Sequence, residues 1–342
     1  MALASSGALP RARLGRTDME ITRVGFGAWA IGGGDWIFGW GEQDDRNSVA
    51  AIRHAVTRGI NWIDTAAVYG FGHSEEVVAR ALSEIPQSDR PYVFTKCGLI
   101  RDTANPGGMP HKIATAESLR GEVETSLKRL GVERIDLYQM HWPATDGTPV
   151  EEYWQTLLDL KTEGKVRAVG LSNHNVGQLE AAETRGHVDT LQPPFSAINR
   201  AAGAAELPWC AAHGTGVIVY SPMQSGLLTG RFSVERARAL PKNDWRSQNP
   251  DFTGDGLVRN LKVAEAMVPV ADAHGTSVAA VAVAWTLAWP GVTAAIVGAR
   301  SPSQVDGWLE AASLHLTDGD MRAIGAAITA AGAGSGPVVP AA

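Results

Sequence analysis

Four polar side chains stand at or just after the ends of apolar runs in this sequence. Asp64 and Tyr69 belong to INWIDTAAVYG, Lys96 ends YVFTK, and His141 ends IDLYQMH. Together they can move a proton: an ammonium beside a phenol lowers the phenol pKa, and a carboxylate keeps a buried ammonium charged. We expect Tyr69 to be the general acid, with Lys96 and Asp64 as its charged neighbours. His141 would orient a carbonyl oxygen.

Each of these residues, taken alone, also has an ordinary structural explanation. Asp64 could cap a helix, Tyr69 could anchor a loop, and Lys96 and His141 could be structural polar groups. A Lys and a His that end otherwise apolar runs are nevertheless unusual. Their recurrence on consecutive runs favours one shared proton-transfer site.

The elements that must position them alternate along the chain. Apolar, often β-branched runs alternate with helical patterns whose apolar residues recur every three to four positions, and this order predicts a parallel sheet. The expected strands are 24–29, 60–66, 92–98, 135–142, 166–173, 190–196, 216–222 and 294–299. The clearest helical stretches are 46–57, 118–130, 151–162, 258–273 and 278–288. Eight such units predict an α/β fold, the (β/α)8 TIM barrel, whose usual length is about 250 residues.

One domain accounts for nearly all of the 342 residues. We expect a flexible N-terminal tail over 1–10, a single barrel over 11–332 that opens with a β-hairpin, and a flexible C-terminal tail over 333–342. Three connections are too long for simple turns: 32–45, 99–114 and 231–256. All three follow a strand, so they belong on the C-terminal rim, where barrels of this kind place their active sites.

Large aromatic residues mark the expected substrate pocket. Trp29 and Trp142 end strands, and Trp36 lies in the first long connection. We interpret them as walls around an apolar carbonyl substrate, although aromatic side chains that fill gaps beneath loops would give the same pattern.

Composition narrows the remaining classes of function. A net charge of −6 without a basic run does not predict a nucleic-acid surface. Cys97 and Cys210 form neither a disulfide framework nor a metal motif. No segment has the length of a signal peptide core or a membrane span, so we expect a cytoplasmic protein without a metal. The metal-dependent barrel hydrolase, a competing reading, lacks its usual ligand pairs.

The segments that end the last two predicted strands and form the loops after them predict an anion site. They read VYSPMQSGLLTGR and AIVGARSPSQV, and both combine Gly and Ser with an arginine, Arg231 or Arg300. These loops form the standard phosphate site of such barrels, and GxGxxG is absent. A proton donor at one end and a phosphate site at the other indicate a nucleotide cofactor lying across the rim.

The motifs together resemble the aldo-keto reductase family, and its bacterial branch in particular, over nearly the whole chain. They are GFGAW at 25–29, DTAAVYGFGHSE at 64–75, TKCG at 95–98, QMHWP at 139–143, VGLSN at 169–173, YSPMQSGLLTGR at 220–231 and IVGARSPSQV at 296–305. The resemblance implies that Asp64, Tyr69, Lys96 and His141 are the catalytic tetrad. Tyr69 would protonate the carbonyl oxygen while NADPH delivers hydride.

The resemblance also assigns cofactor contacts. Ser172, Asn173 and Gln192 would hold the nicotinamide carboxamide, with Tyr220 stacked on its ring. The pyrophosphate would lie against Ser221, Met223, Gly226, Leu228, Gly230 and Arg231. The adenosine end would lie against Gly298, Arg300 and Gln304, with Arg300 favouring the 2′-phosphate. Further cofactor contacts would come from Gly27, Ala28, Trp29, Asp64, Pro222, Val297 and Ala299.

The expected activity is therefore reversible, NADPH-dependent reduction of aldehydes or ketones, with NAD(H) possible instead of NADP(H). Trp308 stands where relatives often have an adenine-contacting Asn, and Arg231 where Lys is common, which bears on cofactor choice. The partner is a small carbonyl compound, neither nucleic acid nor membrane; the sequence does not indicate which carbonyl, nor the oligomeric state. A cofactor-binding regulatory subunit, of the channel β-subunit type that shares this fold and tetrad, is the alternative.

Overall fold

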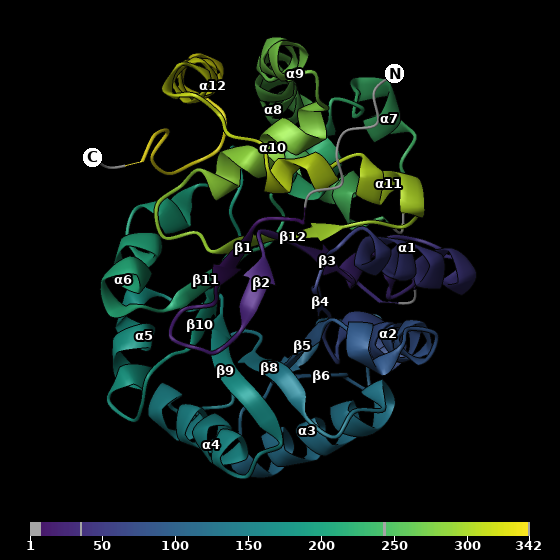
Figure 1. Ribbon diagram of the computed structural model, residues 1–342, viewed down its shortest axis with the longest axis vertical. Helices are drawn as coiled ribbons and strands as arrows, with labels where there is room; N and C mark the ends of the chain where they lie inside the picture. The colour runs from purple at the N-terminus through teal and green to yellow at the C-terminus, as the bar shows by residue number, and fades with distance from the viewer. Residues whose placement is uncertain (1–7, 35, 242–243, 341–342) are drawn as a thin grey trace.

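Eight parallel strands close into a barrel in a computed structural model that describes residues 8–34, 36–241 and 244–340 (Figure 1). In chain order the barrel strands are β3 (Val24–Gly27), β4 (Trp62–Asp64), β5 (Tyr92–Cys97), β8 (Ile135–Met140), β9 (Val166–Ser172), β10 (Thr190–Gln192), β11 (Gly216–Val219) and β12 (Ala294–Gly298). All eight predicted strands are present. The (β/α)8 prediction is confirmed.

Helices surround the barrel, as Figure 1 shows. They are α1 (Asp45–Thr57), α2 (His73–Ser83), α3 (Ala116–Leu130), α4 (Val150–Thr162), α5 (Val176–Glu183), α6 (Glu206–His213), α7 (Val234–Arg238), α8 (Gly254–Ala266), α9 (Val268–His274), α10 (Val278–Leu287), α11 (Pro302–Asp306) and α12 (Asp318–Ala331). The helix predicted over 258–273 is divided between α8 and α9, and a proline stands in the first turn of α9. A proline there removes a backbone donor, so it favours a helix start over a continued helix.

The predicted hairpin covers the N-terminal end of the barrel. It consists of β1 (Arg11–Arg13) and β2 (Glu20–Thr22), which are antiparallel. Its apolar residues Leu14, Met19 and Ile21 are fully buried and belong to one cluster with the interior residues of the barrel. Closure of this end leaves the opposite rim as the place for a site.

Strand alternation decides which side chains enter the barrel. On β5, Phe94 belongs to the interior cluster, whereas Val93 and Cys97 belong to the layer between strands and helices. Lys96 therefore points inward, two residues beyond Phe94. On β8, Leu137 is interior, so Gln139 and then His141 follow on the inner side. The same parity puts polar groups at the C-terminal rim above an apolar interior.

The two predicted tails differ. Most of 1–10 lies outside the described residues, and Pro10 already accepts a hydrogen bond from Arg23 N at 3.0 Å. The tail predicted over 333–342 is held against the barrel in its first part: Ala333 is buried, and Arg200 donates to the carbonyls of Ala333 and Pro337 at 3.1 Å each. The prediction missed Arg200, a buried cation that binds this segment.

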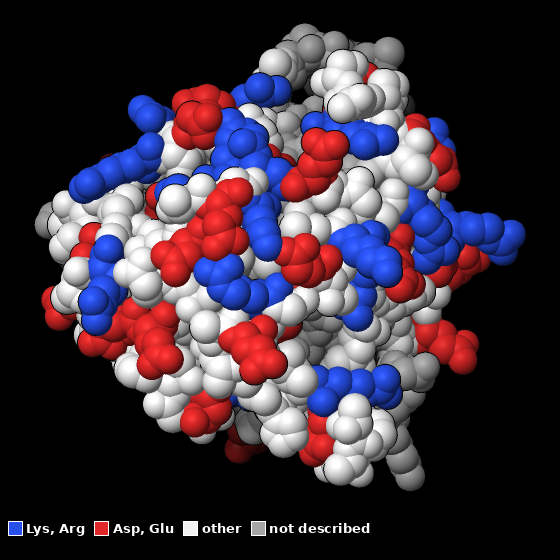
Figure 2. Space-filling view, turned by 90° about the horizontal axis from the view of Figure 1, so that it is seen from below, with Lys and Arg blue, Asp and Glu red and all other residues white. Residues whose placement is uncertain are grey.

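Charge on one face of the molecule is mixed. In Figure 2, acidic and basic side chains are interspersed without a field of one sign. By itself, none of the described helices is long and apolar enough to cross a membrane. One pair, Gly254–His274 and Val278–Leu287, passes together on length and composition but is bent by 95°.

Candidate active site

The four predicted proton-transfer residues meet at the C-terminal end of the barrel. Lys96 Nζ donates to Asp64 Oδ1 at 2.5 Å and to the Thr65 carbonyl at 2.8 Å, and lies 3.4 Å from Tyr69 OH. The His141 ring stands edge-on to the Tyr69 ring, with centroids 5.7 Å apart. All four residues are nine-tenths or more buried. The geometry is that of one compact site.

Tyr69 reaches this site because the chain turns sharply after β4. Tyr69 begins a short 3-10 segment, η2 (Tyr69–Gly72), in which Gly70 and Phe71 have φ of +61° and +53°. A Cβ on Gly70 would lie 2.0 Å from the Gly32 carbonyl oxygen. Only glycine fits there, so this residue type sets the turn that brings Tyr69 back over the barrel.

Burial governs the charges of the tetrad. It raises the pKa of the Tyr69 phenol well above the usual value, and the Asp64 carboxylate adds to this. Burial, then the Lys96 charge, lowers the pKa of His141 well below its ordinary value, so the imidazole is neutral. The expectation that Lys96 brings the Tyr69 pKa toward neutrality is not met, because burial raises this pKa and the Asp64 carboxylate, 2.5 Å from the Lys96 ammonium, raises it further. Tyr69 therefore holds its proton at neutral pH.

The residues predicted to bind the carboxamide are joined to the tetrad by hydrogen bonds. Gln192 Nε2 donates to Asp64 Oδ2 at 2.9 Å, and Ser172 Oγ donates to the Gln192 carbonyl at 2.9 Å. Asn173, which has a left-handed φ of +63°, donates to the His141 carbonyl at 2.9 Å and accepts from Tyr220 OH at 2.8 Å. The structure brings these residues together at the rim.

A buried pair behind this cluster escaped the sequence reasoning. His174 Nδ1 lies 2.8 Å from the Ser172 carbonyl, which only accepts, so Nδ1 carries the proton. Nε2 then accepts from Tyr153 OH at 2.6 Å. Burial lowers the pKa of His174 to about 4, which keeps this tautomer neutral. The pair fixes the backbone from which Ser172 and Asn173 project. A histidine directly after a strand-end Asn was the available signal.

Aromatic side chains form one wall. Trp29 stacks on Tyr69 with centroids 6.4 Å apart, and Trp36 lies 6.0 Å from the same ring. Trp142, next to His141, is 38% exposed, with Lys112 Nζ 4.7 Å from its ring centroid. Trp245, from the long segment after β11, stacks on Trp29 at 5.9 Å. It was not predicted, although an aromatic residue in a predicted rim loop could have indicated it.

The loop after β11 has an unusual backbone. Ser221, Gln224 and Ser225 have φ of +56°, +43° and +51°, values that residues other than glycine rarely adopt. Gly226 follows with a φ of +102°. Strain of this kind collects at functional sites, where surrounding structure holds it. The loop contains the predicted pyrophosphate residues. Arg231, at its end, is exposed.

Arg300 follows β12 and is held by the first long connection. Its Nε donates to Gln43 Oε1 at 2.6 Å, its Nη1 to the Trp40 carbonyl at 3.2 Å, and its Nη2 to the Glu42 carbonyl. Its backbone N–H donates to Gln304 Oε1 at 2.8 Å. The remaining predicted rim positions, Gly27, Ala28, Pro222, Met223, Leu228, Gly230, Val297, Gly298 and Ala299, lie at the ends of β3, β11 and β12 or in the loops that follow. Trp308, by contrast, is 2% exposed and belongs to the core.

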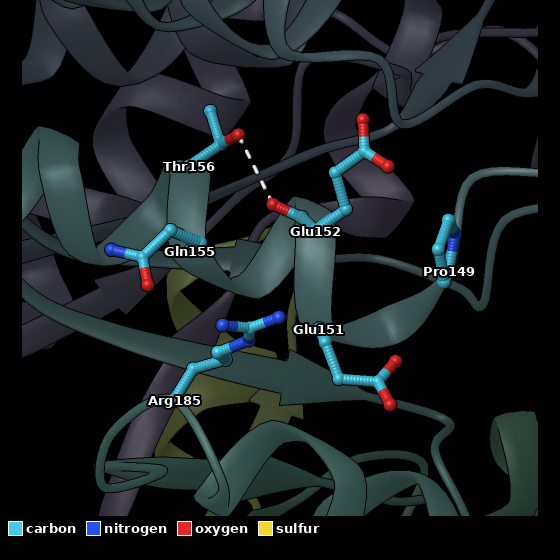
Figure 3. A pocket seen from close by; sticks show the side chains of 6 residues that line it. All are labelled: Pro149, Glu151, Glu152, Gln155, Thr156 and Arg185. Atoms are coloured by element: carbon cyan, nitrogen blue, oxygen red, sulfur yellow. Dashed lines mark hydrogen bonds between the residues drawn. The ribbon is translucent and has the colours of Figure 1, made fainter.

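A hollow elsewhere on the surface is not this site. A cavity of about 530 Å³ is lined by Pro149, Glu151, Glu152, Gln155, Thr156 and Arg185 (Figure 3). Most of these residues belong to the first turns of α4, outside the barrel. Its lining contains none of the tetrad, so we place the chemistry at the rim.

Comparison with known proteins identifies relatives over nearly the whole chain. The model of the aldo/keto reductase family matches residues 23–329. Aldo-keto reductase YhdN of Bacillus subtilis is 35% identical, over 90% of each chain, and an NADH-specific methylglyoxal reductase of Escherichia coli is 34% identical, over 90% of this chain and 94% of its own. Among solved structures, a glycerol dehydrogenase from Gluconobacter oxydans has a TM-score of 0.83 and 38% identity, over 94% of this chain and 95% of its own.

Proposed function

Because this chain belongs to the aldo/keto reductase family, and is an NAD(P)H-dependent oxidoreductase, we propose that it reduces aldehydes or ketones to alcohols with Tyr69 as the proton donor. The observation that carries the proposal is the buried contact of Lys96 Nζ with both Asp64 and Tyr69, beside a neutral His141.

Each residue has a distinct task. The nicotinamide cofactor, when bound, supplies the hydride. Tyr69 gives its proton to the substrate oxygen as negative charge develops there, and Lys96, 3.4 Å away, stabilises the resulting phenolate. Asp64 keeps Lys96 charged in its buried position. The neutral His141 imidazole orients the carbonyl by donating a hydrogen bond. The reverse reaction uses the same groups with Tyr69 as base.

Features of the rim fit a dinucleotide. Ser172, Asn173 and Gln192 would hold the nicotinamide end, and the strained loop after β11 would hold the phosphates. We assign NADP(H) as the preferred cofactor on the strength of Arg300 beside Gln304, with NAD(H) as the alternative. One relative is named as NADH-specific, so both cofactors belong in the test.

The aromatic wall supports a small carbonyl substrate with an apolar face. Trp29 and Trp36 contact the Tyr69 ring, and Trp142, next to His141 in the sequence, would be a third residue of the substrate pocket. Two relatives point to useful probes: methylglyoxal for reduction and glycerol for oxidation. A panel of these and benzaldehyde, followed by cofactor absorbance at 340 nm, tests the proposed direction and substrate class. Cofactor binding without turnover of any compound would favour the regulatory-subunit alternative.

Tyr69→Phe tests the role of the acid. General acid catalysis contributes roughly 10²–10⁴-fold, so kcat should fall by at least that range while cofactor affinity stays near the wild-type value. Tyr92→Phe is the matched control. It also removes a tyrosine hydroxyl, but at the start of β5, far from the end that carries Lys96, so kcat should stay near the wild-type value. A Tyr69→Phe enzyme with near-normal kcat would refute the assignment.

A further inference from the structure

The long segment after β11 folds back onto the rim. After α7 it forms a short 3-10 turn, η6 (Trp245–Gln248), followed by a second, η7 (Pro250–Phe252). Gln224, in the strained loop, donates to Asp251 Oδ2 at 2.8 Å, which ties this segment to the predicted phosphate site. Segments that are 20 or more residues apart are therefore packed as one surface.

Arg246 lies at the centre of that contact. Its side chain is largely buried, and the residue is 8% exposed. Its Nε and Nη2 donate to the two oxygens of Asp244 at 3.0 and 2.6 Å, and its Nη1 donates to the Ser225 carbonyl at 3.2 Å. A Cβ on Gly226 would lie 3.6 Å from Nη1. The guanidinium therefore contacts the backbone of Ser225, one of the strained residues of the loop, and lies beside Gly226.

Arg300 approaches the same place from β12. The Arg246 guanidinium lies 4.5 Å from the Trp40 ring centroid, and Arg300 Nη1 donates to the Trp40 carbonyl at 3.2 Å. Burial, and then the neighbouring charge of Arg246, lowers the pKa of Arg300, and the Asp244 carboxylate acts in the opposite direction. Asp244 is ion-paired with Arg246 at 2.6 Å. Two partly buried cations around one carboxylate leave an excess of positive charge.

The hydrogen-bond donors are also in excess. A guanidinium has five N–H donors, and each of these arginines uses three on acceptors among the described residues. The indole Nε1 of Trp40 and of Trp245 is buried and has no acceptor in the described part of the chain. The guanidinium donors that remain free beside the predicted phosphate loop make this cluster complementary to a ligand that is negatively charged and rich in acceptor oxygens.

We propose that Arg246 is a phosphate-binding residue of the cofactor site, carried by the segment after β11 and acting together with Arg300. The proposal rests on the proposed function in naming a dinucleotide as the ligand. The shared chemistry is a phosphate group, either the pyrophosphate, which Ser225 and Gly226 border, or the 2′-phosphate of NADP(H). Arg246 binds and does not take part in proton transfer.

Equilibrium binding tests this assignment without turnover. Titration calorimetry would measure the Kd of NADPH and of NADH for wild type and for the double variant Asp244→Asn/Arg246→Met, which avoids leaving a buried carboxylate unpaired. We expect a loss of roughly ten- to a hundredfold, the size of a charge-assisted contact. Loss for both cofactors assigns the pyrophosphate, and loss for NADPH alone assigns the 2′-phosphate. Arg246→Lys, which keeps the charge, should restore part of the affinity.

Arg238→Met is the matched control, because it removes an exposed arginine from the same segment. The Kd of the wild type should rise steeply with salt, and that of the double variant less steeply. Equal affinity in the double variant, the control and the wild type would overturn the proposal while leaving the proposed reductase activity intact. A wild type that binds neither cofactor would instead refute the proposed function.

Discussion

The tetrad and the arginine cluster differ in how their charges are compensated. In the tetrad, Lys96 is matched by Asp64 at 2.5 Å, and its remaining donors reach Thr65 and Tyr69. In the cluster, Arg246 and Arg300 share Asp244 and keep donors without acceptors. The first arrangement is complete in the protein alone, and the second is complete only with an anion. In this pair of sites, the fully compensated charge belongs to the proposed catalytic group, and the charges that share one carboxylate belong to the proposed binding group.

Their supports differ as well. Three of the tetrad residues lie on or directly after barrel strands, where alternation fixes the direction of each side chain. The arginine cluster is built from three connections, around Trp40, Arg246 and Arg300, whose mutual placement depends on side-chain contacts. Changes to the tetrad should therefore act on turnover, and changes to the cluster on affinity.

The largest expected effect comes from breaking the compensated pair. Lys96→Met leaves the buried Asp64 without its charged partner, with Gln192 as its remaining donor, which destabilises the fold by about 3–5 kcal/mol and lowers kcat by roughly 10²-fold or more. The double variant Asp64→Asn/Lys96→Met should recover the melting temperature and leave kcat low. Thermal unfolding and steady-state rates, measured on the same samples, separate the two effects. Recovery of kcat in the double variant would contradict a catalytic role for the ammonium.

A smaller effect is expected at the uncompensated end. Arg300→Ala should weaken NADPH binding by roughly ten- to a hundredfold and leave NADH binding nearly unchanged. Only NADPH has the 2′-phosphate, whose charge of about −1.5 to −2 would pair with the guanidinium. Because Gln43 and the Trp40 and Glu42 carbonyls already hold the guanidinium, the lower end of that range is the sharper expectation. Fluorescence titration gives both Kd values. Equal losses for the two cofactors would show that Arg300 does not discriminate between them.

The smallest effect should come from the pair behind the carboxamide residues. Tyr153→Phe leaves His174 Nε2 without a donor, at a cost of about 1–3 kcal/mol in unfolding free energy. The affinities for NADPH and NADH should fall equally, by up to about tenfold, because the nicotinamide end is common to both cofactors. Tyr153→Phe/His174→Phe should not regain cofactor affinity, because the Ser172 carbonyl then loses its contact with His174 Nδ1. Unequal losses for NADPH and NADH would place the pair elsewhere in the site.

The tetrad lies on barrel strands and the arginine cluster on long connections, and this difference decides how well the sequence predicts each region. The barrel and the placement of Lys96 and His141 depend on local periodicity, which a single chain displays. The contact of Trp245 with Trp29, or of Arg246 with Ser225, depends on how a long connection folds back, and no local pattern encodes that. The predicted direction of the Tyr69 pKa shift is wrong for a related reason. That direction depends on how deeply the phenol is buried and on the Asp64 charge beside Lys96, and both are properties of the folded chain.

The alternation on β5 also sets which changes this chain can accumulate. Insertion of one residue between Phe94 and Thr95 would turn the ammonium of Lys96 outward into the helix layer and bring Thr95 inward, so a single event would separate Lys96 from Asp64 and Tyr69. Length changes in 32–45, 99–114 or 231–256 leave that parity untouched. Insertions and deletions in these three places would therefore alter ligand and cofactor contacts while the strand parity that places the tetrad stays intact.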